Sequence, residues 1–69
     1  MQATARIGET AGRVWQLLNT KGALSVSQLP KELNEKAPLV HQALGWLARE
    51  GKIEYTVEGK KTIVKLVGQ

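Results

Sequence analysis

The spacing of apolar residues changes at Gly51, and this change constrains the fold more than any other feature of the chain. Before Gly51, apolar residues recur three or four positions apart, which is the period of one face of a helix. After Gly51, they alternate with polar residues, which is the period of a strand. The 69 residues suffice for one small domain spanning 1–69. The pattern therefore predicts an α+β fold with its helices first and its strands last.

Three helices are predicted before the change of period. The first covers residues 9–19, the second opens at Ser27, and the third runs from near Pro38 to residue 50. Residues 24–26 are too few for a further helix and predict a short strand rung between the first two helices. The residues expected to face the core from the second and third helices are Leu29, Leu33, Val40, Ala43, Leu44 and Leu47.

Two serines compete for the start of the second helix. The Ser27 hydroxyl can cap the backbone N–H groups of the next turn, and Pro30 is early enough to be tolerated there. Ser25 followed by Gln28 offers a competing capping box. We place the start at Ser27 and keep the capping box as the alternative. A turn at residues 34–36 then leads to the third helix.

The end of the chain predicts a β-hairpin whose turn contains Gly59. A two-residue loop, with Gly59 as its first or second residue, places apolar positions of one strand beside those of the other. A three-residue loop from Glu58 to Lys60 would place Ile53 beside Lys65, and we reject it. The positions aligned by the two-residue loop are Ile53, Tyr55, Val57, Val64 and Leu66.

Three helices followed by a C-terminal hairpin are the arrangement of a winged helix-turn-helix. In this arrangement the third helix is the recognition helix and the β-hairpin is the wing. The predicted fold is therefore a single winged-helix domain, and its class points to double-stranded DNA as the partner.

Three segments also carry a family resemblance, and they are Ile7–Trp15, Leu24–Leu29 and Ala43–Ile53. Together they resemble a family of short stand-alone winged helix-turn-helix proteins of bacteria and archaea, which is a domain of unknown function. The match covers nearly the whole chain. The resemblance implies a DNA-binding type of domain that assembles as a homodimer.

The scarcity of reactive side chains excludes several classes of function. The chain has no Cys, which excludes disulfides and thiolate metal sites, and its one histidine, His41, has no Asp to orient it as a base. We expect no enzymatic activity, metal, cofactor or small-molecule ligand. Neither a signal peptide nor about 18 consecutive apolar residues occurs, so we expect a cytoplasmic protein without a membrane partner.

The distribution of charge favours contacts with the DNA backbone over readout of bases. Ten Lys and Arg against six acidic residues give a net charge of +4, which attracts phosphate. However, residues 38–48 contain no Lys or Arg, so the recognition helix has few side chains that can contact base edges. We therefore expect a DNA-binding protein of the transcriptional-regulator type with weak sequence readout. The residues predicted to contact DNA are Lys36, Pro38, His41, Gln42, Arg49, Lys60, Lys61 and Lys65.

Trp46 lies beside the buried stripe of the third helix, where it either covers the core or anchors an interface. Gly45 next to it favours an interface, because glycine within a helix is destabilising unless another backbone approaches closely. Trp15 follows Val14 on the first helix and is expected in the core. The alternative function is consequently a protein-interaction or homodimerisation module that does not bind DNA.

Overall fold

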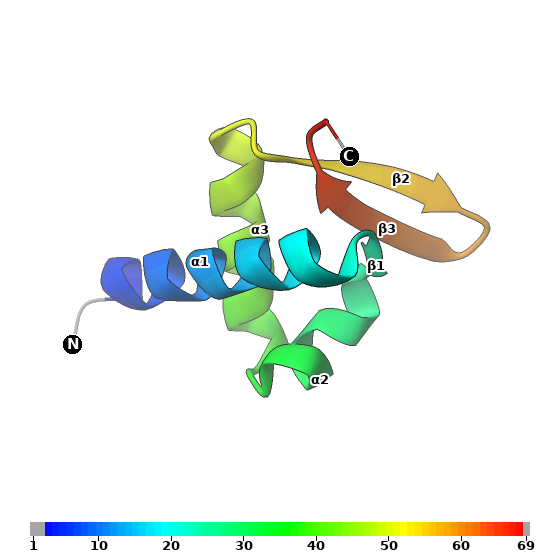
Figure 1. Cartoon of the computed structure of the whole chain (residues 1–69). Helices are drawn as coiled ribbons and strands as arrows, with labels where there is room; N and C mark the ends of the chain where they lie inside the picture. The colour runs from blue at the N-terminus through cyan, green and yellow to red at the C-terminus, as the bar shows by residue number, and fades with distance from the viewer. Residues whose placement is uncertain (1–2, 69) are drawn as a thin grey trace.

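The computed structural model describes residues 3–68, which form three helices followed by a β-hairpin (Figure 1). A short strand between the first two helices joins the hairpin in an antiparallel sheet of order β1-β3-β2. The predicted α+β winged-helix architecture is thus confirmed. The elements are α1 (Ala3–Lys21), β1 (Leu24–Ser25), the 3-10 helix η1 (Val26–Gln28), α2 (Leu29–Leu33), α3 (Ala37–Arg49), β2 (Ile53–Glu58) and β3 (Lys61–Leu66).

Helix α1 begins six residues earlier than predicted, at Ala3 and not at residue 9. A contact far along the chain supports the added turns, since the guanidinium of Arg6 lies 3.5 Å from a carboxylate oxygen of Glu35. The predicted end of the helix is nearly right. Gly22 has a φ of 82° and donates a hydrogen bond from its N–H to the Leu18 carbonyl, which terminates the helix in the left-handed manner typical of glycine.

The predicted helix start at Ser27 is wrong, and the competing start at Ser25 is the one that the chain uses. Ser25 precedes η1, and its backbone N–H donates to Oε1 of Gln28 at 3.0 Å. The Ser27 hydroxyl lies within η1, 2.9 Å from the hydroxyl of Ser25. Helix α2 then follows with Pro30 in its first turn and ends at Asn34, which adopts a left-handed conformation.

The wing has the predicted register. Glu58 pairs with Lys61, so the loop contains two residues, with Gly59 as the first at a φ of 62°. This loop places Ile53 opposite Leu66 and aligns the apolar positions of both strands. On its other edge, β3 pairs with β1. The short rung therefore ties the wing to the segment between α1 and α2.

The core lies where α1 and α3 cross and where the sheet covers them (Figure 1). It includes every residue that we expect to face the core from the second and third helices. None of the helices within residues 3–68 combines the length and hydropathy that a membrane span requires. The buried apolar residues are Ala11, Val14, Leu18, Leu29, Leu33, Val40, Ala43, Leu44, Leu47, Ile53, Val64 and Leu66.

Several large apolar side chains lie outside this core. The wing extends beyond the helices (Figure 1), so Tyr55 and Val57 share a strand face with buried Ile53 but are 45% and 73% exposed. Trp15 is 37% exposed, and its expected place in the core is wrong. The cause is geometric, because Trp15 is one position past fully buried Val14 and its side chain therefore points about 100° away around the helix.

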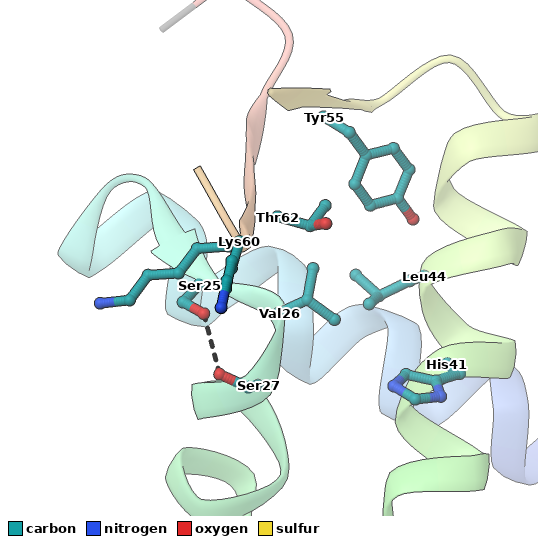
Figure 2. A pocket seen from close by; sticks show the side chains of 9 residues that line it. Ser25, Val26, Ser27, His41, Leu44, Tyr55, Lys60 and Thr62 are labelled. Carbon is teal, nitrogen blue, oxygen red and sulfur yellow. Dashed lines mark hydrogen bonds between the residues drawn. The ribbon is translucent and has the colours of Figure 1, made fainter. Parts of the chain in front are cut away.

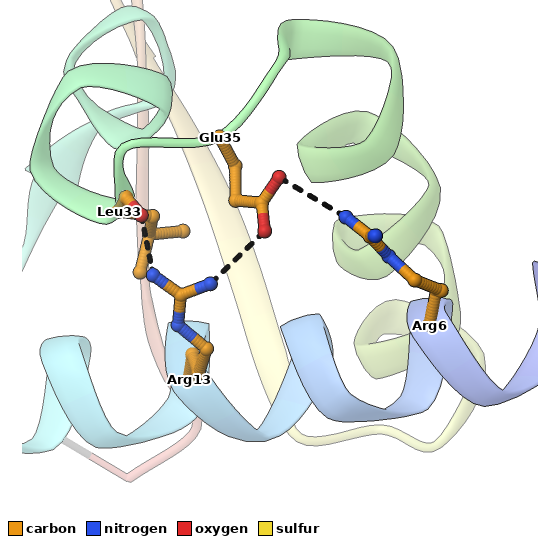
Figure 3. A network of polar contacts seen from close by, with 4 residues as sticks. All are labelled: Arg6, Arg13, Leu33 and Glu35. Carbon is orange, nitrogen blue, oxygen red and sulfur yellow. Dashed lines mark hydrogen bonds and ion pairs between the residues drawn. The ribbon is translucent and has the colours of Figure 1, made fainter.

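A small polar network joins α1 to the segment between α2 and α3 (Figure 3). Glu35 lies between two arginines of α1 and receives a hydrogen bond from Arg13 at 3.0 Å, in addition to the contact with Arg6. Arg13 also donates to the backbone carbonyl of Leu33. Each exposed pair contributes only about 0–1 kcal/mol, so the network fixes the orientation of this segment more than it stabilises the fold.

Leu29→Ala is expected to lower the free energy of unfolding by about 2–5 kcal/mol, because Leu29 is fully buried and its truncation leaves a cavity. Urea denaturation followed by circular dichroism measures this loss. The matched control is Val57→Ala on the exposed wing, with an expected loss of less than about 1 kcal/mol. Equal losses in the two variants would contradict this assignment of the core.

Candidate nucleic-acid interface

A groove of about 440 Å³ lies between the wing and α3, with β1 and η1 along its third side (Figure 2). Its floor is apolar and includes Val26 and nearly buried Leu44. Hydroxyl, imidazole and ammonium groups surround that floor. All of these groups are hydrogen-bond donors, and no carboxylate lines this groove in the described part of the chain. The lining residues are Ser25, Val26, Ser27, His41, Leu44, Tyr55, Lys60, Lys61 and Thr62.

Each side of the groove is positioned by a feature of the local sequence. His41 lies one position past Val40, so the buried stripe of α3 turns its imidazole toward the groove. On the wing, Tyr55 lies on the same strand face as Ile53, and its ring extends from β2 toward α3 (Figure 2). The two-residue turn then carries Lys60 and Lys61 to the outer end of the groove.

Tyr55 is a titratable group that the fold perturbs. Its ring is half-covered, and this partial burial raises the pKa of the phenol above its ordinary value of 10.0, because burial disfavours the charged phenolate. The phenol is therefore a neutral O–H donor at physiological pH. It lies beside the apolar floor, where it can donate a hydrogen bond to an acceptor such as a phosphate oxygen.

Ion pairs remove several cations from consideration as phosphate ligands. The guanidinium groups of Arg6 and Arg13 both pair with the carboxylate of Glu35, and Nζ of Lys21 lies 2.8 Å from Oε1 of Glu32. Lys65 is among the residues predicted to contact DNA. Its Nζ lies 3.6 Å from Oε1 of Glu54 across the hairpin, and Lys65 does not line the groove. The cations that make no such pair within residues 3–68 are Lys31, Lys36, Arg49, Lys52, Lys60 and Lys61.

The other predicted residues divide between two surfaces of α3. Pro38, Gln42, Gly45 and Arg49 recur at spacings of three or four and share its outward face, where all are exposed. Lys36 precedes this face as the N-cap residue and is also exposed. His41 belongs instead to the groove. The structure thus brings His41, Lys60 and Lys61 together and leaves the outward face of α3 with few polar groups.

The opposite flank of α3 carries Trp46, which is 41% exposed. It shares a shallow hollow with Trp15 of α1 and does not line the groove. Trp46 thus lies at the surface, and its two expected roles, covering the core or anchoring an interface, both stay predictions. The Gly45 backbone beside it is open, since a Cβ added there meets nothing within 4 Å.

Tyr55, Ser27 and Thr62 line the groove, although the sequence predicts no binding role for them. The sequence pattern predicts only strand pairing for Tyr55 and only a helix cap for Ser27. A signal for Tyr55 is its place two strand pairs beyond Ile53 toward the turn, on the same face of the strand. Within residues 3–68 no three His or acidic residues gather in a way that holds a metal ion.

Comparison with known proteins gives a consistent set of matches. Residues 1–66 match a family model described as a winged helix-turn-helix domain (DUF2582). The uncharacterized protein MJ1608 of Methanocaldococcus jannaschii is 44% identical in an alignment of 64 residues, and the match covers 88% of this chain and 90% of the relative.

Two solved structures are also similar to this chain. The solution structure of protein BT2368 from Bacteroides thetaiotaomicron has a TM-score of 0.86 at 28% identity, covering 97% of this chain and 82% of the other. A structure concerned with the DNA recognition and protein interaction domains of HOP2 has a TM-score of 0.58 at 31% identity. It covers 88% of this chain and 97% of the other.

Tyr55 is the one tyrosine of the chain, so the ultraviolet absorbance of tyrosinate reports its ionisation directly. We expect a midpoint above 10.0 in the folded protein and a return to the ordinary value in denaturant. Because the raised pKa means that the folded state holds the proton more tightly, this contribution to stability is complete below pH 10.0 and declines as the pH rises through the folded-state pKa. Identical midpoints in the folded and denatured protein would contradict the partial burial of this ring.

Proposed function

Since the chain belongs to the winged helix-turn-helix family DUF2582, we propose that it binds double-stranded DNA, chiefly through the sugar-phosphate backbone. The observation that carries the proposal is the groove between the wing and α3. It presents Lys60, Lys61 and the Tyr55 hydroxyl with no acidic residue among its described lining residues. Phosphate contacts of this kind supply most of the affinity in non-specific DNA binding.

In the proposed complex, α3 enters the major groove with its outward face toward the bases. The wing lies beside it, so that a phosphate strand passes along the groove between them. Lys60 and Lys61 neutralise phosphates, and His41 and the Tyr55 phenol donate hydrogen bonds to backbone oxygens. Lys36 contacts the backbone at the start of α3, since an exposed cation there lies at the edge of the reading face.

Base readout is weak in this proposal because α3 offers few groups that reach base edges. Gln42 can pair with adenine in a bidentate manner, and Arg49 at the end of α3 can reach guanine. Pro38 and Gly45, on the same face, have no side-chain donor or acceptor. A role in transcription would then depend on occupancy of DNA, because the isolated domain discriminates little between base sequences.

Two further considerations support binding over other activities. The similar HOP2 structure is described in terms of DNA recognition, and its identity of 31% goes beyond a likeness of fold alone. We propose no catalytic role, because the His41 imidazole has no carboxylate beside it in the described groove to orient it as a base. The cytoplasmic location expected from the sequence stays a prediction.

Replacing both Lys60 and Lys61 by Gln is expected to weaken binding to a mixed-sequence duplex. It should also reduce the slope of log affinity against log salt by about 0.9 for each lysine that contacts a phosphate. Fluorescence anisotropy between about 50 and 200 mM salt measures both effects, with a dissociation constant of about 10⁻⁴–10⁻⁶ M expected for the unaltered chain.

The matched control is Lys31→Gln, which removes a cation that has no ion pair within residues 3–68 and that lines neither the groove nor the hollow shared by Trp15 and Trp46. Its salt slope should stay close to that of the unaltered chain. Absence of binding by the unaltered chain at low salt would overturn the proposed function. Equal slopes in all three proteins would remove the wing from the mechanism.

Weak readout predicts that duplexes of unrelated sequence bind with affinities within about tenfold of one another. Gln42→Ala should likewise change the preference among them by less than about tenfold. Tenfold is about 1.4 kcal/mol, which lies at the lower end of the about 1–3 kcal/mol that a good bidentate base contact contributes. Competition between duplexes of different sequence measures both quantities. A preference of more than about a hundredfold that Gln42→Ala abolishes would show base-specific recognition instead.

A further inference from the structure

The exposed large apolar side chains of the chain fall into two groups. Tyr55 and Val57 lie on the wing, where Tyr55 lines the groove. Trp15, Trp46 and Val67 lie elsewhere, with exposures of 37%, 41% and 54%. The proposed DNA complex uses none of these last three residues. They therefore call for a separate account.

The second group forms one continuous surface, which we name the tryptophan face. A hollow of about 310 Å³ between α1 and α3 is lined by both Trp15 and Trp46, together with Gly8 and Gly12. Trp15 also lines an adjoining hollow with Val67 at the end of β3. The face thus extends over one side of α1, the C-terminal half of α3 and the chain that follows β3.

Contacts within the chain do not explain the shape of this face. Gly8 and Gly12 lie one turn apart on α1, and a Cβ added at either meets nothing within 4 Å. A glycine in a helix costs about 0.5–1 kcal/mol relative to alanine, and neither glycine has a positive φ that would require it. The open hollow beside two projecting indoles is therefore suited to receive a bulky side chain from another molecule.

The charges around the face distinguish it from the groove. Glu50 lies beside Trp46, and Lys52 lies between the two hollows. Neither makes an ion pair within residues 3–68. Neighbouring charges of both signs do not favour a polyanion such as DNA, but they are complementary to a surface that carries the same two signs.

We propose that the tryptophan face binds a second copy of this chain across a two-fold axis. A two-fold interface must be self-complementary, and this face offers projecting indoles, a hollow to receive one, and charges of both signs on its rim. An interface of ordinary size buries about 800 Å² of each partner, which is about one-sixth of the 4683 Å² accessible surface of the chain. An interface of that size on so small a chain has to span several elements, and the tryptophan face runs from α1 across α3 to the end of β3.

The dimer leaves the groove accessible. Trp46 and His41 lie on opposite flanks of α3, so a copy seated on the Trp46 flank does not cover the lining of the groove. Two grooves then belong to one particle, which doubles the number of phosphate contacts. The dimer itself does not depend on the proposed DNA binding and is tested without DNA.

Sedimentation equilibrium of the whole chain, without DNA, over about 10–500 µM protein tests the proposal, and a dimer with a micromolar dissociation constant is expected. Gly8→Arg should weaken this dimer at least tenfold, because it fills the hollow with a charged side chain. The variant should still fold, since the new Cβ meets no neighbour within the chain. Trp46→Gln should weaken the dimer in the same way.

The matched control is Thr20→Arg, which adds the same charge to α1 but lies outside the tryptophan face. It should leave the dissociation constant unchanged. If Trp46→Gln fails to fold by circular dichroism, Gly8→Arg alone decides the result. A monomer at the highest concentration, open-ended association, or a dimer that folded Gly8→Arg does not weaken would each overturn the proposal.

Discussion

The packing of α3 across α1 is the contact on which the rest of the structure depends. The stripe of α3 centred on Val40 and Leu44 is buried against the face of α1 that carries Val14 and Leu18. Once one stripe of a helix is buried in the core, the directions in which its two flanks and its outer face point are also fixed. The partner of each remaining side chain of α3 follows from this single contact.

The two flanks of α3 consequently have different chemistry. One faces the wing and carries His41 into a groove rich in hydrogen-bond donors, with two lysines at its outer end. The other faces α1 and carries Trp46 beside Trp15, with charges of both signs at the rim. The first suits a phosphate strand and the second suits protein. The two proposed interactions can therefore occur together on one small domain.

The position of the charges matters more than the net charge of +4. Three cations of α1 are paired with Glu32 of α2 and with Glu35 in the turn after it, and these pairs join α1 to α2 and to that turn. Lys65 is paired within the wing. This pairing leaves Lys60 and Lys61 as cations directed at a common groove. The capacity to bind the DNA backbone thus depends on which cations the ion pairs leave available, and not on the net charge alone.

The order of the helices, the buried stripe of α3 and the hairpin register could all be predicted from the sequence, because each follows from a local period or from the length of one loop. The added turns of α1, the surface position of Trp15 and the role of Tyr55 could not. They depend on contacts between distant parts of the chain, such as Arg6 with Glu35 and the wing with α3. Local patterns determined which residues face the core. Only the tertiary structure decided which exposed residues meet, since that depends on how the helices cross and how far the wing extends beyond them.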